Sequence, residues 1–141
     1  MSKNGSGGFR IDHLGIAVPS IDQALRFWRD QLGMTAGARE RVAAEDVDVA
    51  MIEAGESRLE LIEAAGPDSV IARFVANKGG GLHHVALRVP DLAGIVERLR
   101  GAGARLLNEP RPGAGGHRYV FLHPGSTGGV LLELIQDEEA G

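Results

Sequence analysis

The sequence predicts an α+β fold made of two tandem βαβββ modules. The segment Ile11–Pro19 recurs, shifted by 71 residues, at Leu82–Pro90. Each copy is followed by a helical pattern and then by three strand-like segments. The chain has 141 residues, of which 43% are hydrophobic, so it has the size and the apolar content of one compact domain. We therefore expect a single domain over residues 9–136.

Composition narrows the classes of function. The formal net charge is −4, and the 15 basic and 19 acidic residues are interspersed, which argues against nucleic acid as a partner. Without cysteine, only histidine and carboxylate oxygens remain as strong metal ligands. No apolar run is long enough to span a bilayer, so we expect no membrane partner and a cytoplasmic protein. We expect a flexible N-terminus over residues 1–8 and a frayed C-terminus over residues 137–141.

The first module is expected over about residues 9–65. Its first strand ends at Pro19, and Ser20 is the predicted N-cap of a helix, with Gln23 completing a capping-box pattern. The apolar residues of this helix follow the spacing i, i+3, i+4, i+7: Ile21, Ala24, Leu25 and Trp28. Three further strands are expected at about 34–41, 46–53 and 58–63.

A linking helix is expected over about residues 67–78, packed over the first sheet. The second module is expected over about residues 80–136, where Asp91 takes the place of Ser20 as the helix N-cap. The apolar positions of its helix keep the offset of 71: Leu92, Ile95, Val96 and Leu99. Its later strands are expected at about 104–108, 117–123 and 129–135.

Four residues occupy matched positions in the two modules and predict a metal site. His13 and His84 lie in the first strands, and Glu60 and Glu133 lie in hydrophobic last strands. An unpaired carboxylate there would lose its hydration, and no lysine or arginine is repeated at matching positions to compensate it. The simpler alternative, satisfied core histidines and solvent-facing glutamates, fits one such residue better than four in matched pairs.

One divalent ion held by two imidazoles and two carboxylates would satisfy all four groups. This donor set suits cobalt, manganese, nickel, zinc or magnesium and does not choose among them. An octahedral ion would keep two positions open, where a substrate with two suitably spaced oxygens can bind.

Segments around these ligands resemble the methylmalonyl-CoA epimerases of the vicinal oxygen chelate superfamily. Gly80–Val89 is similar to the GLHHxxxxV segment of the epimerases, and the resemblance continues through Gly113–Arg118, Phe121–Pro124 and Thr127–Leu134. Glyoxalases of the same superfamily typically carry an acidic turn before the last ligand, and Pro124–Gly129 differs from it. The resemblance implies the glyoxalase/vicinal oxygen chelate fold, in which the two modules form a cupped mixed sheet around one metal site.

The implied activity is the metal-dependent interconversion of (R)- and (S)-methylmalonyl-CoA. The α-carbon of this CoA thioester lies between a thioester and a carboxylate, so a metal can stabilise the enediolate formed when the α-proton leaves. The resemblance implies that Glu133 both binds the metal and acts as one of two acid/base groups, and that the protein is a homodimer; we expect the ion to be Co²⁺. Two alternatives are a glyoxalase I-type lactoylglutathione lyase and a metal-free small-ligand-binding module.

The second acid/base group is missing where the resemblance places it, because that position is Val49. The nearest carboxylates are Glu45, Asp46 and Asp48. Strand alternation turns Asp48 away from Val49, and Glu45 shares its face only if the strand extends that far. A metal-bound water or His117 are the other candidates.

The glycine-rich segment Gly113–Gly116 is a candidate cradle for the phosphates of CoA, with Gly115, Gly116 and Arg118 as the expected contacts. A plain hairpin loop is an equally good interpretation of these glycines. His83 is expected to be structural, because it points away from His84 along the strand. His123 is expected either to line the cavity or to pack.

Overall fold

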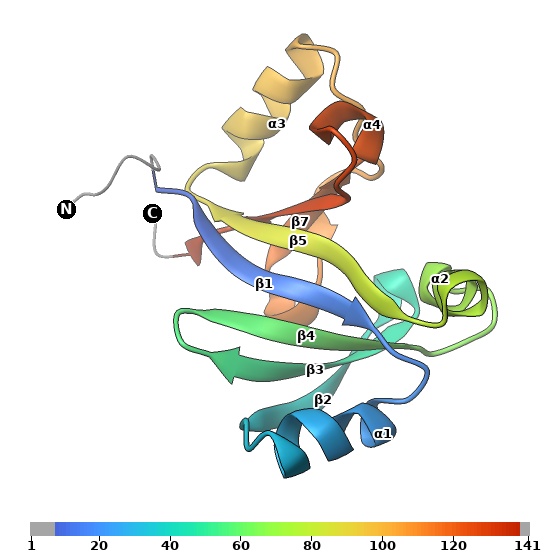
Figure 1. Ribbon diagram of the computed structural model, residues 1–141. Helices are drawn as coiled ribbons and strands as arrows, with labels where there is room; N and C mark the ends of the chain where they lie inside the picture. The colour runs from blue at the N-terminus through green and yellow to red at the C-terminus, as the bar shows by residue number, and fades with distance from the viewer. Residues whose placement is uncertain (1–7, 139–141) are drawn as a thin grey trace. The chain divides into compact units, whose positions relative to one another are not determined.

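The computed structural model describes residues 8–138, so residues 1–7 and 139–141 of the expected flexible ends lie outside the described part of the chain. Two compact units make up the protein. The N-terminal unit comprises His13–His83, and the C-terminal unit comprises, among the described residues, 8–12 and 84–138. Each unit contains four strands of mixed direction, and the helix that follows the first strand packs on one face of them (Figure 1).

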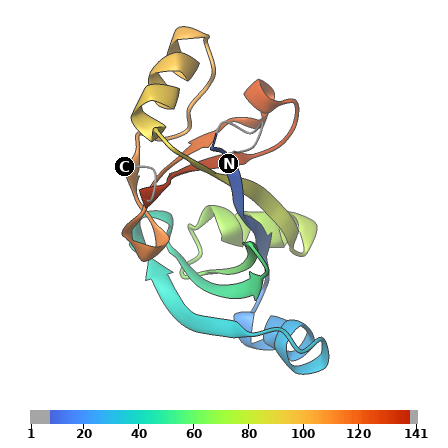
Figure 2. The ribbon, with the colours of Figure 1, turned by 90° about the vertical axis from the view of Figure 1, so that its left-hand side faces the viewer.

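The sheet of the N-terminal unit has the strand order β2-β3-β4-β1. The strands are β1 (Arg10–Ala17), β2 (Ala36–Val42), β3 (Val47–Ala54) and β4 (Ser57–Ala64). The pairs β2–β3 and β3–β4 are antiparallel, whereas β1 joins β4 in parallel, as a strand reached through a helical connection does. Figure 2 shows β2, in cyan, as the long curved edge strand of this sheet.

The first helix of this unit begins where the sequence predicts, and the linking helix begins at Val70, about three residues later than expected. The side chain of Ser20 accepts a hydrogen bond of 3.2 Å from the amide of Gln23 at the start of α1 (Ile21–Leu25). The chain continues in a wider π-helical segment, η1 (Arg26–Gln31), and a short 3-10 helix, η2 (Ala43–Glu45), lies between β2 and β3. The linking helix is confirmed as α2 (Val70–Lys78), which Ser69 caps and which contacts β4.

The sheet of the C-terminal unit has the order β5-β8-β7-β6 and repeats the same pattern of parallel and antiparallel pairs. The strands are β5 (Gly81–Val89), β6 (Arg111–Pro112), β7 (Arg118–Leu122) and β8 (Leu132–Gln136). Its helices are α3 (Leu92–Gly101), η3 (Ala114–Gly116) and α4 (Pro124–Thr127). Asp91 caps α3, as predicted, by accepting from the amide of Gly94.

The strand predicted at 104–108 is wrong. Only an isolated bridge joins Leu106 to Leu122 there, and the short β6 lies later, at Arg111–Pro112. The side chain of Asn108 takes over part of the pairing, because its Oδ1 accepts from the amide of Phe121. Pro110 and Pro112 lack an amide hydrogen, and this limits how far a regular ladder can extend.

The two cores match residue by residue. Each lies between a sheet and the helix that follows the first strand, and six buried residues of one unit correspond to six of the other: Val18 with Val89, Ile21 with Leu92, Leu25 with Val96, Ala50 with Val120, Ile52 with Leu122, and Leu61 with Leu134. Polar contacts match as well. The amide of Ile21 donates to Glu63 Oε1 at 2.8 Å, and the amide of Leu92 donates to Gln136 Oε1 at 2.9 Å. The predicted duplication therefore extends to the packing.

Candidate metal centre

In the N-terminal unit, the first predicted ligand pair is in direct contact. His13 Nε2 on β1 lies 3.2 Å from Glu60 Oε1 on β4. The residues are only 2% and 6% exposed. Glu60 lies between Leu59 and Leu61, which pack on the helix side, and strand alternation therefore turns its carboxylate to the opposite face of the sheet. We call this the site face of the unit.

The C-terminal unit repeats this arrangement. His84 Nε2 on β5 lies 3.1 Å from Glu133 Oε1 on β8, and His84 is 4% exposed. The register is the same in both units, because Glu60 pairs with Gly15 and Glu133 pairs with Ala86, each two residues beyond the histidine. The ring of Phe121 stands edge-on to the His84 imidazole, with centroids 5.3 Å apart, and limits its rotation.

Both distances fit two ligands of one ion. Donor atoms about 2.1 Å from a metal lie about 3.0 Å apart at an octahedral angle and about 3.4 Å apart at a tetrahedral angle. The observed 3.1 and 3.2 Å fall within this range. The same spacing also suits a hydrogen bond from a protonated Nε2 to the carboxylate, so binding of an ion would release that proton.

The donor chemistry of His13, His84 and Glu133 defines a candidate group for a metal ion among the described residues. Glu60 is not part of this group, and its role as a fourth ligand stays a prediction that rests on its contact with His13. Two imidazoles with a carboxylate suit a divalent transition ion and leave coordination positions for other ligands.

Val49 lies on the site face of the N-terminal unit. It pairs with Ile62, two residues beyond Glu60 on β4, and is 3% exposed. Of the carboxylates nearest in sequence, Asp48 faces the helix side, as predicted, and bonds Arg41. The hydrogen bond and the positive charge of Arg41 lower the pKa of Asp48 below its usual value, so Asp48 stays ionised at neutral pH.

Glu45 does not reach this face either. It lies in η2, outside β3, which begins at Val47. Asp46 closes the same turn in a left-handed conformation. None of the three carboxylates considered from the sequence replaces the missing group at Val49.

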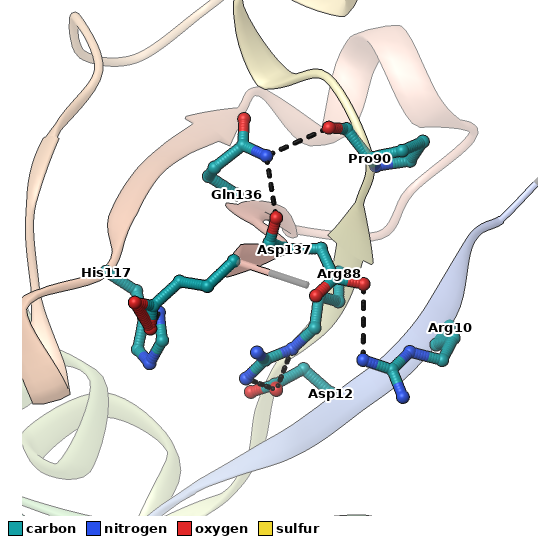
Figure 3. A network of polar contacts seen from close by, with 8 residues as sticks. Arg10, Asp12, Arg88, Pro90, His117, Gln136 and Asp137 are labelled. Atoms are coloured by element: carbon teal, nitrogen blue, oxygen red, sulfur yellow. Dashed lines mark hydrogen bonds and ion pairs between the residues drawn. The ribbon is translucent and has the colours of Figure 1, made fainter. Parts of the chain in front are cut away.

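A network of ion pairs holds the strand that leads to His13 (Figure 3). Buried Asp12, directly before His13, accepts from Arg88 at 2.9 Å, and buried Asp137 pairs with Arg10 at 3.2 Å. Asp137 was expected to fray with the C-terminus, which is wrong for this residue: its backbone amide bonds Val89 and its carboxylate is paired. The Asp12–Arg88 pair is the more buried of the two, because the side chain of Arg88 is 16% exposed and that of Arg10 is 52% exposed.

His117 lies at the edge of this network (Figure 3). Its Nδ1 atom is buried and lies 3.0 Å from Glu138 Oε2, in a direction that does not meet the geometry of a hydrogen bond. His117 directly precedes β7 and is in phase with Tyr119 and Phe121, but it lies four residues before Phe121, the residue paired with Glu133. Its role as an acid/base group stays a prediction.

The glycine loop forms the η3 turn between β6 and β7. The amide of Gly113 donates to the carbonyl of His117, and the amide of Gly116 donates to Gly113, so these two amides are already engaged within the loop. Arg118 donates to the carbonyl of Pro110 at 2.8 Å. The loop is therefore an ordered turn, and the CoA contacts predicted at Gly115, Gly116 and Arg118 stay predictions.

The two remaining histidines have structural contacts. His83 stacks edge-on against Phe74 of α2, with ring centroids 5.1 Å apart, in agreement with the structural role expected for it. His123 caps α4, because its Nδ1 accepts a hydrogen bond of 2.8 Å from the amide of Gly125.

Comparison with known proteins identifies the family. Residues 12–121 match the Glyoxalase/Bleomycin resistance protein/Dioxygenase superfamily, and the chain belongs to this family. The strands of residues 8–138, in two βαβββ modules, form the glyoxalase-like fold. Within the described residues, no helix is long and apolar enough to cross a membrane.

Three relatives are particularly similar. The chain is 40% identical to an uncharacterized protein, YqjC, of Bacillus subtilis over 90% of its own length and 91% of the relative. It is 38% identical to the ethylmalonyl-CoA/methylmalonyl-CoA epimerase of Cereibacter sphaeroides over 90% and 97% of the two chains. A variant of the Streptomyces coelicolor methylmalonyl-CoA epimerase in complex with 2-nitronate-propionyl-CoA is 34% identical, with a TM-score of 0.84 over 92% and 97% of the chains.

Proposed function

We propose that the protein is a metal-dependent epimerase that interconverts (R)- and (S)-methylmalonyl-CoA. The observation that carries the proposal is the duplicated His–Glu contact, which has the same register in both units and in which both histidines are buried. The similarity to epimerases over nearly the whole chain supports the choice of substrate. We propose that both pairs bind one divalent ion, and among the candidates we expect Co²⁺.

The chain's own residues would hold and deprotonate the substrate. When bound, the divalent ion supplies positive charge that stabilises negative charge on the substrate oxygens as the α-proton leaves. Glu133 is the proposed base at one face of the α-carbon, because its side chain is the more exposed of the two glutamates, at 12% against 8% for Glu60. The ring of Phe121, which stands edge-on to the buried His84 imidazole, keeps this imidazole oriented toward Glu133.

Proton exchange in deuterated water tests the proposal. The metal-loaded protein is incubated with methylmalonyl-CoA, and the α-proton signal and the ratio of the epimers are followed by NMR and chiral analysis. We expect loss of the α-proton together with inversion, and loss of both activities after chelation. No exchange by the metal-loaded protein refutes the epimerase. Formation of lactoylglutathione from the glutathione hemithioacetal would indicate the glyoxalase-type reaction instead.

A further inference from the structure

A glutamate of the edge strand β2 lies on the same sheet face as Val49. Glu40 pairs directly with Val49, and Val49 pairs with Ile62 of β4. Residues paired in this way project to the same side of a sheet, with Cα atoms about 5 Å apart. Since Ile62 and Glu60 alternate in phase along β4, Glu40 belongs to the site face of the N-terminal unit.

The neighbours of Glu40 fix its direction independently. Arg39 forms an ion pair with Asp22 of α1, and Arg41 forms one with Asp48. Asp22 belongs to the helix that covers the core, and Asp48 is in phase with Ala50, which packs beneath that helix. Both arginines therefore point to the helix side, and the residue between them must project to the opposite face.

The side chain of a glutamate at position 40 is long enough to bring its carboxylate to the side of the sheet on which Val49 lies. Two methylene groups separate its carboxylate from Cα, so the carboxylate extends across a neighbouring strand only about 5 Å away. Val49 is short, buried and without a transferable proton, so a carboxylate on this row of the sheet must come from a neighbouring strand. Glu40 itself is exposed, so its carboxylate can exchange protons with water.

We propose that Glu40 is the second acid/base residue of the epimerase, in place of the group missing at Val49; this inference rests on the proposed function. For one epimer, the α C–H bond breaks, its proton passes to the Glu133 carboxylate, and the electron pair spreads onto the thioester carbonyl. Protonated Glu40 then delivers its proton to the other face of the α-carbon, and a new C–H bond forms there. For the other epimer, Glu40 removes the proton and Glu133 returns one, and exchange with water resets both carboxyl groups.

Replacement of Glu40 by glutamine separates the two half-reactions. In deuterated water, Glu40→Gln should still exchange the α-proton of the epimer that Glu133 deprotonates, with retention of configuration. Exchange of the opposite epimer and net inversion should both fall by about 10²–10⁴-fold, the usual contribution of a positioned acid/base group. The matched control is Glu53→Gln, an exposed glutamate in phase with Val49 on β3, which should behave as the wild-type protein does.

A rescue variant and a metal measurement complete the test. Glu40→Gln combined with Val49→Glu restores a carboxylate to the same row of the sheet. Its rate of inversion should be at least about tenfold higher than that of Glu40→Gln alone. Glu40→Gln should bind the metal as tightly as the wild-type protein. The inference is overturned if Glu40→Gln inverts both epimers at the wild-type rate, or if it loses metal and both exchange reactions together. A wild-type protein that exchanges neither epimer instead refutes the proposed function.

Discussion

Glu60→Ala tests whether Glu60 is a metal ligand in addition to His13, His84 and Glu133. An ion at 100 times its dissociation constant stabilises a protein by about 2.7 kcal/mol. For 141 residues the entropy of unfolding is about 0.3 kcal/mol per kelvin, so the ion should raise Tm by about 9 °C. Loss of a residue that only supports a ligand can already weaken metal binding about 100-fold, and we take this value for Glu60→Ala. The same ion concentration then stabilises the variant by about 0.4 kcal/mol and raises its Tm by only about 1 °C.

Differential scanning fluorimetry of chelator-treated protein, with and without added Co²⁺, measures this shift. The comparison uses the metal-induced change in Tm, so any intrinsic effect of the substitution on the apo protein cancels. Glu53→Ala, at an exposed position of the same sheet, is the matched control and should keep the wild-type shift. If Glu60→Ala also keeps the full shift, Glu60 is not a ligand, and its contact with His13 is only a hydrogen bond.

Three further substitutions and one pKa measurement test other parts of the structure. His84→Ala should abolish metal binding and proton exchange together, and retained metal in elemental analysis would contradict the proposed site. Gln136→Ala removes the side-chain acceptor at the start of α3 and should lower the free energy of unfolding by about 1 kcal/mol and Tm by about 3 °C. Glu63→Ala removes the matching acceptor at the start of α1 and should have the same effect. An unchanged melting curve for either variant would contradict the capping role. The carboxyl carbon of Asp48 should titrate below the usual pKa because Arg41 bonds it, so its contribution to stability is present above the unfolded-state pKa and is lost as the pH falls through the lower folded-state pKa. A raised midpoint would return Asp48 to the candidates for acid/base catalysis.

The duplication made the fold and the two His–Glu contacts predictable. Two copies of one pattern locate a helix cap twice, as at Ser20 and Asp91, and they distinguish a functional glutamate from an accidental one. Hydrophobic periodicity then orients the helices, because residues such as Ile21 and Leu92 must face their sheets. The caps and the hydrophobic periodicity are local patterns, and the His–Glu pairs recur in both copies, so one sequence without relatives is enough to find them.

Glu40 was missed for a reason that lies in the sheet. The register between β2 and β3 shifts between Ala36 and Arg39, so alternation counted from the start of the strand gives the wrong face for the residues that follow. The ion pair of Arg10 with Asp137 joins residues 127 positions apart, and nothing in their local sequence indicates the contact. Irregular register and distant pairing are tertiary properties, which hydrophobic periodicity does not record.

The two units share their cores but differ on one row of the site face. The matched positions are Glu40 with Arg111, Val49 with Tyr119, Ile62 with Ile135, and Ala17 with Arg88. Core positions repeat because each copy packs the same helix on the same sheet, whereas this row is free to diverge. In the C-terminal unit Arg111 Nε donates to the hydroxyl of Tyr119 at 2.9 Å, so this row is cationic and donor-rich, whereas the N-terminal row contains a carboxylate.

The proposed substrate, methylmalonyl-CoA, has no twofold symmetry, because it has an anionic carboxylate and, next to it, the α-proton that is to be moved. A carboxylate on this row of one unit and cationic donors on the matched row of the other suit the proposed substrate, and this difference between the two copies favours Glu40 as an acid/base group.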